Sequence, residues 1–377
     1  MYTNIKFIYG MSGCSKTTTA IQIALHSHFK SICCAYTHSA VNNLKEKAKD
    51  VENVKFMTIH KMLGIGIDTL IKRKLIKSFV GVELVIIDEF TLIPLDILDY
   101  LFELTELYQD IKFVFVGDFI QLPSIEQSKQ PINLNLLTDE KFKSLKLPFR
   151  QTIRIADHLS NSCYVDQHFK QADKLVLMHN YRNGTHVNEI LNNALDYKFE
   201  VLRVNSIKDR RTINKLIDDG YIVISAMYEH LSLINDLCFK SDQNQNCVKT
   251  KIGLSNINQD FILNENVSIN NDDYVNGDTV NVVKLCNESE CMIKKGELEP
   301  IMVNMVVLLP FNFITVHKSQ GRTYDKVLII LDDLFEITML YTAITRARDD
   351  VKFIKIKHLP NKEDIEAFKV MRDCIYQ

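Results

Sequence analysis

The stretch that most constrains the fold joins an apolar segment to a helix-like segment through a loop of small residues. The apolar run Ile5–Tyr9 predicts a short buried strand, and the spacing of apolar residues from Thr17 to Phe29 predicts a helix. The loop between them begins at Gly10 and ends in Lys16-Thr17, an order typical of phosphate-binding loops. Backbone N–H groups of such a loop and the N-terminus of its helix point at a polyphosphate. The stretch therefore predicts a nucleotide site.

The loop residues that fit the usual motif each have an expected role. Lys16 would reach the terminal phosphates, and the Thr17 hydroxyl would bind magnesium. Ser15 stands where the usual motif has its second glycine, and its Cβ would crowd a backbone that wraps phosphates. The alternative is a loop that only turns a strand into a helix. The residues expected at the nucleotide are Gly10, Met11, Ser12, Gly13, Cys14, Ser15, Lys16, Thr17 and Thr18.

A second landmark is a pair of carboxylates at the end of an apolar run. Leu84–Ile87 predicts a fully buried strand, and Asp88 and Glu89 follow it directly. In a phosphate-loop enzyme the first carboxylate binds magnesium and the second orients or deprotonates the attacking water. An Asp-Glu pair alone is also an ordinary helix N-terminus. Its position downstream of a phosphate loop favours the catalytic interpretation, with ATP and Mg²⁺ as cofactors and Thr17 and Asp88 on the metal.

Further polar residues follow other predicted strands. Gly117-Asp118 ends the apolar run 113–116, and the amide of Gln121 lies close enough to sense a γ-phosphate. Thr37 and Ser39 follow the apolar run 31–36, where they would line a ligand crevice or cap the next helix. The alternation of strands and helices predicts an α/β fold with a mostly parallel, doubly wound sheet.

The composition is that of a soluble globular protein, with 46% hydrophobic and 24% charged residues. The length of 377 residues predicts two or three domains. A net charge of −2 gives no bulk signal for nucleic-acid binding, so that function has to rest on local residues. Because nothing resembles a signal peptide or a bilayer-spanning stretch, we expect an intracellular protein, cytoplasmic or nuclear, that is neither secreted nor bound to a membrane.

Three segments are expected along the chain. Residues 1–165 form the first α/β domain, with a short insert at 66–83. Residues 166–242 and 305–377 form a second α/β domain, and 243–304, which is rich in Asn, Gln, Ser and Asp, forms a small β module inserted into it. A long disordered loop is the alternative for the insert. A zinc site is a further alternative for the cysteines near this insert, although they lack a Cys-x2-Cys knuckle.

The ordered motifs resemble those of superfamily 1 helicases, in the branch that contains RecD, Dda and the petite-integration-frequency (Pif) DNA helicases. The resemblance spans about Gly10 to Arg348. Thr58-Ile59-His60 resembles the Pif type in particular. The other motifs that carry the resemblance are Gly117-Asp118-Phe119-Ile120-Gln121-Leu122-Pro123, Asn180-Tyr181-Arg182, Thr315-Val316-His317-Lys318-Ser319-Gln320-Gly321 and Thr345-Arg346-Ala347-Arg348.

The resemblance implies two RecA-like parallel-sheet domains in tandem, with an SH3-like β module as the insert. It also implies ATP hydrolysis that drives 5′→3′ movement along single-stranded DNA. Arg182 and Arg346 would act as arginine fingers from the second domain, and Gln320 and Gly321 would couple the strand to the nucleotide. The catalytic set would be Lys16, Glu89, Gln121, Arg182 and Arg346. The contacts to nucleic acid would come from Thr37, His38, His60, Thr315, His317 and Lys318.

Some features depart from the family pattern. Few residues precede the first predicted strand, so we expect loose selectivity for adenine. The segment 66–83 is short for a pin that splits duplexes, so we expect robust translocation with weak strand separation. The abundance of Asn, Ile and Lys is typical of an AT-rich viral or mobile-element genome and suggests a role in viral replication. We expect a monomer that works with replication or repair proteins.

Three other functions remain open from the sequence. Gln320–Tyr324 also resembles viral superfamily 1 RNA helicases, so RNA is an alternative substrate. An ATP-gated single-strand binding protein would have no need of Glu89, Arg182 or Arg346. A phosphate-loop kinase would have no use for the motifs around Gln121 and His317. The products distinguish these functions: a motor releases free phosphate, a kinase phosphorylates an acceptor, and a binding protein does neither.

Overall fold

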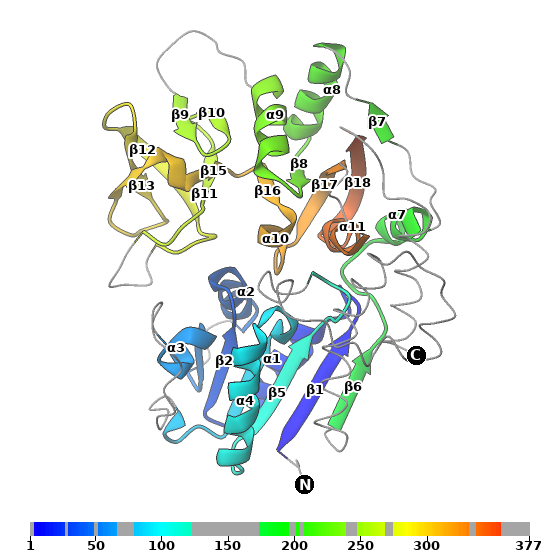
Figure 1. Cartoon of the computed structure of the whole chain (residues 1–377), viewed down its shortest axis with the longest axis vertical. Coiled ribbons are helices and arrows are strands. Elements are labelled where there is room, and N and C mark those ends of the chain that lie inside the picture. Colours follow the sequence, from blue (N-terminus) through cyan, green and yellow to red (C-terminus); the bar gives the residue numbers. More distant parts are fainter. Residues whose placement is uncertain are drawn as a thin grey trace. The chain divides into compact units, whose positions relative to one another are not determined.

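Figure 1 shows the computed structural model of the chain, which divides into two compact units between Asn183 and Gly184. Among the described residues, no helix combines the length and apolar character needed to cross a membrane. The described residues are 4–26, 29–48, 52–65, 79–122, 173–195, 201–203, 207–238, 247–267, 274–331 and 337–355.

The first unit is built on a 6-stranded sheet of parallel strands in the order β3-β2-β4-β5-β1-β6. Because every strand runs the same way, all carboxyl ends lie at one edge of the sheet. The apolar runs predicted from the sequence form its central strands. The strands are β1 (Ile5–Gly10), β2 (Ser31–Ala35), β3 (Val54–Thr58), β4 (Leu84–Asp88), β5 (Lys112–Gly117) and β6 (Asp173–Leu177).

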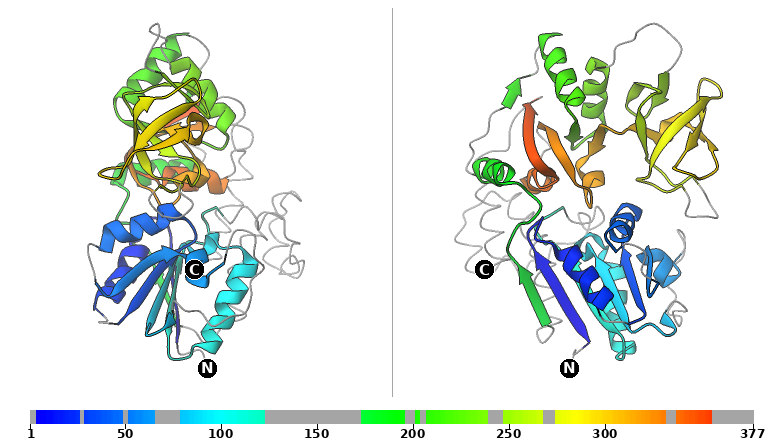
Figure 2. Two further views of the ribbon diagram at one scale, coloured as in Figure 1. Left: turned by 90° about the vertical axis from the view of Figure 1, so that its left-hand side faces the viewer. Right: turned by 180° about the vertical axis from the view of Figure 1, so that it is seen from behind.

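Helices cover both faces of this sheet. The helices α1 (Lys16–His26) and α2 (His38–Ala48) lie on one face, and α4 (Leu95–Leu107) lies on the other (Figure 2). Short helical turns follow two strands: α3 (Ile59–Leu63) after β3, and a 3-10 turn (Phe90–Leu92) after β4. The helices thus leave the carboxyl edge open for the loops that carry the polar residues.

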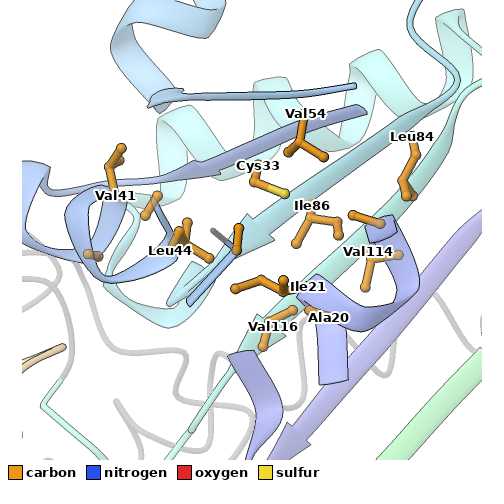
Figure 3. Close-up of a cluster of buried hydrophobic side chains, with 14 of the residues drawn as sticks. Ala20, Ile21, Cys33, Val41, Leu44, Val54, Leu84, Ile86, Val114 and Val116 are labelled. Carbon is orange, nitrogen blue, oxygen red and sulfur yellow. The ribbon is translucent and has the colours of Figure 1, made fainter. Parts of the chain in front are cut away.

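Successive side chains along the central strands point to opposite faces of the sheet, as in any β-strand. Ile8, Val114 and Val116 pack with Ala20 and Ile21 of α1 in one buried cluster (Figure 3). On the opposite face Phe115 packs against three other phenylalanines. Its ring centroid lies 5.2 Å from Phe7, 5.2 Å from Phe102 of α4 and 5.9 Å from Phe90.

The second unit has a 5-stranded parallel sheet in the order β16-β8-β17-β18-β7. Its strands are β7 (Val201–Arg203), β8 (Tyr221–Ser225), β16 (Phe313–Thr315), β17 (Tyr324–Leu331) and β18 (Ala347–Lys355). Its helices are α7 (Thr185–Leu195), α8 (Ile207–Asp218), α9 (Tyr228–Cys238), α10 (Val316–Ser319) and α11 (Ile337–Ile344). The α/β fold expected for both halves of the chain is confirmed.

An antiparallel β module lies between α9 and β16 of this unit, as the sequence predicted. A 5-stranded sheet in the order β14-β13-β12-β11-β15 and a β9–β10 hairpin form it, around a buried cluster that includes Phe261, Ile293 and Leu308. The strands are β9 (Cys247–Thr250), β10 (Gly253–Asn256), β11 (Asp260–Leu263), β12 (Thr279–Leu285), β13 (Glu290–Lys294), β14 (Ile301–Asn304) and β15 (Leu308–Pro310). Met305–Val307 forms a 3-10 turn.

Two predicted boundaries differ from the structure. The strand β6 pairs with β1, so the first unit extends past residue 165 to Asn183. This strand satisfies the backbone groups on the free side of β1, which an earlier boundary would leave unpaired. The module continues beyond residue 304, because β15 pairs with β11 through Phe261 and Pro310. Residues 66–78, most of the predicted short pin, lie outside the described residues.

The phenylalanine cluster should dominate the stability of the first unit. We expect Phe115→Ala to lower its free energy of unfolding by about 3–5 kcal/mol, because a fully buried ring is lost and a cavity remains. Guanidinium unfolding followed by circular dichroism measures this change. Leu107→Ala on the exposed side of α4 is the matched control and should change stability by less than about 0.5 kcal/mol. Equal effects of the two substitutions would contradict the packing described.

Candidate active site

Strand register brings the polar loops of the first unit together at the carboxyl edge of its sheet. Tyr9 of β1 lies beside Gly117 of β5, and Ile87 of β4 lies beside Phe115 of β5. The residues that follow these strands are therefore neighbours although they are far apart in sequence. They are the loop after Gly10, the Asp88–Glu89 pair and Asp118.

Lys16 is buried and folds back over its own loop. Its Nζ donates to the carbonyl oxygens of Gly10 and Met11, both at 2.8 Å. The same nitrogen lies 3.8 Å from Oδ2 of Asp118. An ammonium held this way is directed into the loop, where a phosphate would be bound by the backbone N–H groups.

Thr17 and Asp88, the two residues expected on one metal ion, lie in direct contact. The Thr17 hydroxyl donates to the Asp88 carboxylate at 3.0 and 3.2 Å. Hydroxyl and carboxylate oxygens are the hard donors that Mg²⁺ prefers, so this pair fits the ion. Burial of Asp88, and then the charge of Glu89, raise the pKa of the Asp88 carboxyl to about 7.

Glu89 adopts a backbone conformation that is rare for a residue with a side chain. Its φ is 51° and its ψ is 41°, in the left-handed region. The strand β4 ends one residue earlier, and the 3-10 turn begins one residue later. Strain of this kind costs on the order of 1–3 kcal/mol and is concentrated at functional sites. The conformation therefore supports a catalytic role for the carboxylate.

Asp118 connects the lysine to the predicted γ-phosphate sensor, a role the sequence interpretation did not assign to it. Gln121 Nε2 donates to Asp118 Oδ2 at 2.9 Å, and the backbone N–H of Ile120 donates to Oδ1 at 3.2 Å. Asp118 is 0% exposed and Gln121 is 5% exposed. A buried carboxylate that contacts both Lys16 and Gln121 lets a change at one be felt at the other. The Gly-Asp pair at a strand end was the available signal.

Arg182 lies in the first unit, which corrects its expected place in the second domain. Its Nη1 donates to Oγ of Ser12 in the phosphate loop at 3.2 Å. The turn is held by Asn180, whose Oδ1 accepts the backbone N–H groups of Arg182 at 3.0 Å and Asn183 at 3.1 Å. The position follows from β6, which joins the first sheet and carries this turn to the edge beside Gly10.

Asn180 also explains a glycine of the phosphate loop. Gly13 has φ +80°, and a Cβ built there would lie 2.2 Å from Oδ1 of Asn180. The backbone N–H of Tyr181 donates to the Gly13 carbonyl at 2.8 Å. The loop and the Asn180–Arg182 turn therefore fit one another closely. Sequence reasoning named Asn180 only as part of a motif and gave neither Asn180 nor Asn183 a structural role, because Gly13, against which they pack, lies far away in the chain.

Arg346 lies in the second unit, where the residue is 1% exposed. Its Nε donates to the carbonyl of Thr342 at 3.0 Å, Nη1 to the carbonyl of Arg322 at 3.5 Å, and Nη2 to Oγ1 of Thr345 at 3.3 Å. Thr342 lies in α11, Thr345 follows that helix directly, and Arg322 lies in the segment that follows α10. The same segment contains Gln320 and Gly321, so three residues of the predicted nucleotide set lie near one another in this unit.

The residues expected on nucleic acid fall into two groups, one in each unit. In the first, Thr37 accepts the backbone N–H of Ala40 at 3.2 Å at the start of α2, which begins at His38. The ring of His60 lies 5.2 Å from that of Tyr36. Register between Ala35 and Thr58 puts these loops side by side at the carboxyl edge. The capping role foreseen as an alternative for Thr37 is therefore real.

In the second unit, Thr315 caps α10 by accepting the backbone N–H of Lys318 at 3.4 Å. Burial lowers the pKa of His317, so this imidazole is neutral at physiological pH. Lys318 does not point to open solvent: its Nζ donates to Asn264 and Asn276 of the antiparallel module. Hydroxyl and imidazole groups at a sheet edge can bind a strand backbone, whereas Lys318 already has protein partners.

Two family descriptions match the chain: an AAA domain over residues 1–127 and a UvrD-like helicase C-terminal domain over residues 310–354. The RecBCD enzyme subunit RecD of Buchnera aphidicola is 24% identical over 95% of this chain and 71% of its own length. The ATP-dependent DNA helicase Pif1 of Campylobacter jejuni is 26% identical over 71% of this chain and 67% of its own length. The chain is similar over most of its length to superfamily 1 helicases of the RecD and Pif1 type.

A solved structure has the same fold. The Pif1 helicase from Bacteroides in complex with ADP-AlF3 and ssDNA superposes with a TM-score of 0.58 at 20% identity, over 97% of this chain and 91% of that one. The alignment includes residues of both units. These similarities make the chain an ATP-dependent enzyme of the helicase kind, and the buried Lys16 loop with its carboxylates is its candidate nucleotide site.

Ser15 of this helicase has φ 60°, a conformation that favours glycine. We expect Ser15→Gly to leave the free energy of unfolding unchanged or to raise it by up to about 1 kcal/mol, because relief of left-handed strain exceeds the extra entropy of the unfolded glycine. Ser15→Val should lower it, since a β-branched side chain disfavours positive φ. Thermal unfolding of the three proteins tests this. Equal stability of all three would show that Ser15 does not hold positive φ in solution.

The raised pKa of Asp88 predicts a pH-dependent stability. Its neutral form is favoured in the folded protein, so the stabilising contribution is complete below about pH 4 and is lost as pH rises to about 7. Asp88→Asn should therefore unfold at a higher temperature than the wild type at pH 8 without metal, and the gap should shrink at pH 5. Calorimetry in EDTA measures both. If Asp88→Asn were less stable than the wild type at pH 8, burial of the ionised Asp88 carboxylate would not be destabilising, contrary to the prediction.

Proposed function

We propose that this helicase is an ATP-driven motor that moves 5′→3′ along single-stranded DNA and separates duplexes. One observation carries the proposal. The carboxyl edge of the first sheet bears the candidate nucleotide site at β1, β4 and β5, and hydroxyl and imidazole side chains at the neighbouring β2 and β3. Thr37 and His60 thus lie on the same sheet edge as Asp88, since Ala35 is in register with both Thr58 and Asp88.

Each catalytic side chain has a specific task in this mechanism. Lys16 exchanges the carbonyls of Gly10 and Met11 for the terminal phosphates. Glu89 orients the attacking water and accepts its proton. Gln121 senses the γ-phosphate, and its hydrogen bond to Asp118 links that event to Lys16. Thr17 and Asp88 would hold Mg²⁺, which when bound compensates the negative charge of the phosphates.

The two arginines supply positive charge to the transferred phosphoryl group in this proposal. Arg182 begins from a hydrogen bond to Ser12, and Arg346 begins from protein oxygens in the second unit. An arginine finger is worth on the order of 10³ or more in turnover. Gln320 and Gly321 couple the nucleotide to the strand contacts at Thr315 and His317, which lie on the same short segment.

DNA is the proposed polymer because the similar proteins are named for it. The Campylobacter relative is an ATP-dependent DNA helicase, RecD is a subunit of the RecBCD enzyme, and the Bacteroides structure contains ssDNA. We further propose that the antiparallel module is an SH3-like barrel and that the protein acts as a monomer inside the cell with replication or repair proteins. RNA as the polymer is the alternative that a substrate comparison excludes or supports.

Directional movement is the decisive test. The wild type should displace streptavidin from a biotin at the 3′ end of single-stranded DNA much faster than from the 5′ end, because a 5′→3′ motor pushes toward the 3′ end. Glu89→Gln is the matched control. It should bind ATP and single-stranded DNA but should not displace streptavidin from either end, since the group that activates water is lost. Faster displacement from the 5′ end would reverse the proposed polarity. Turnover of Glu89→Gln close to wild type would remove Glu89 from the mechanism.

A further inference from the structure

Side chains from α10 and the residues after it hold the antiparallel module within the second unit. The Nζ of Lys318 donates to the backbone carbonyl of Asn264 at 3.2 Å and to Oδ1 of Asn276 at 3.1 Å. It also donates to Oδ1 of Asn264. Asn264 follows β11, and Asn276 precedes β12. One lysine therefore bridges two segments of the module.

This contact uses the whole hydrogen-bonding capacity of the ammonium group. A lysine has three N–H donors and no acceptor, and the three acceptors here are amide or carbonyl oxygens. Burial, and then the charges of Lys251 and Arg322, lower the pKa of Lys318 to about 8. Such surroundings suit a hydrogen-bonded tether. They differ from those of a lysine that is free to contact nucleic acid, which is the role expected for Lys318 from the sequence.

The acceptors on the module are themselves fixed. Asn264 is 7% exposed, its backbone N–H donates to Val307 at 2.7 Å, and its Oδ1 accepts the hydroxyl of Tyr228 at 2.8 Å. Tyr228 begins α9, so the same amide oxygen meets groups from α9 and α10. The contact thus has a defined geometry on both sides, which a chance surface contact of a flexible lysine would lack.

A second side chain continues the connection toward Arg346. Arg322 donates from Nη2 to the carbonyl of Gly277 in the module. Its own carbonyl accepts Nη1 of Arg346 at 3.5 Å, and the backbone N–H of Tyr324 donates to the Arg346 carbonyl at 2.8 Å. Two hydrogen bonds therefore separate the module from the arginine proposed to contact the nucleotide.

We propose that Lys318 and Arg322 are positioning residues that fix the antiparallel module to the segment 315–322, so that the module moves with this segment when ATP binds or is hydrolysed. The inference rests on the proposed function, because it assumes that DNA and nucleotide meet on this segment. It changes the role of Lys318 from a DNA phosphate contact to a structural link. Energetic coupling carried by a continuous set of contacts with defined partners is the physical basis.

Three variants distinguish the two roles of Lys318. Lys318→Ala removes the donor, and Asn276→Ala removes an exposed acceptor without a change of charge. Lys284→Ala, an exposed lysine of β12, is the control for loss of charge in the module. The measurements are the stimulation of ATP turnover by single-stranded DNA, the dependence of DNA affinity on salt, and hydrogen exchange of the module amides.

The tether predicts that Lys318→Ala and Asn276→Ala both lower DNA stimulation, by about 2- to 30-fold, while Lys284→Ala does not. Neither Lys318→Ala nor Asn276→Ala should change the slope of log K for DNA binding against log salt. A lost phosphate contact on a single strand would instead reduce the slope of log K against log salt by about 0.7. The tether would be wrong if Lys318→Ala had a reduced salt slope while Asn276→Ala kept the wild-type stimulation of ATP turnover by DNA. That result would support a contact between Lys318 and a DNA phosphate instead.

Hydrogen exchange tests the tether without reference to DNA. Loss of Lys318 should speed exchange of the backbone amides of Asn264 and Gly277 severalfold, because their segments lose a shared anchor. Unchanged exchange at both amides would overturn the tether. If DNA fails to stimulate even the wild type, the proposed motor function is wrong, and the exchange measurement still decides whether Lys318 holds the module.

Discussion

The register of β1 between β5 and β6 determines where the phosphate loop, Asp118 and Arg182 lie in the first unit. The pairs Tyr9–Gly117 and Gly10–Leu177 bring the phosphate loop, Asp118 and the Arg182 turn to the same point of the sheet edge. A shift of one residue would turn each side chain of the strand to the opposite face. It would also exchange Phe7 with Ile8 between an aromatic face and an aliphatic face. The packing of the two faces therefore fixes the geometry of the active site.

Asp118 connects Lys16 of the phosphate loop to Gln121. It is fully buried between Lys16 and the amide of Gln121. A buried carboxylate is costly without a cationic neighbour, so movement of Lys16 toward a phosphate leaves Asp118 to be stabilised by Gln121 and the backbone N–H of Ile120. The nucleotide and its sensor are then linked by charge compensation, with no need for a large movement of the sheet.

The sequence predicted what depends on local order and missed what depends on distant partners. The phosphate loop, the strand-end carboxylates and the antiparallel insert follow from short-range patterns, and the structure has all three. Nothing in the local sequence tells which sheet β6 joins, so Arg182 was assigned to the wrong unit. Lys318 lies in a motif that suggests DNA contact, and its acceptors at Asn264 and Asn276 give no local signal.

The two proposed arginine fingers both have hydrogen-bond acceptors within the protein when no nucleotide is bound. Arg182 donates to a serine hydroxyl and Arg346 to carbonyl and hydroxyl oxygens, each within its own unit. Neither guanidinium is therefore left as an unpaired buried charge, which would be strongly destabilising. A phosphoryl oxygen is a charged acceptor and forms a stronger hydrogen bond than a neutral oxygen. Recruitment of either arginine then requires an exchange of acceptors, and the negative charge of the nucleotide favours that exchange.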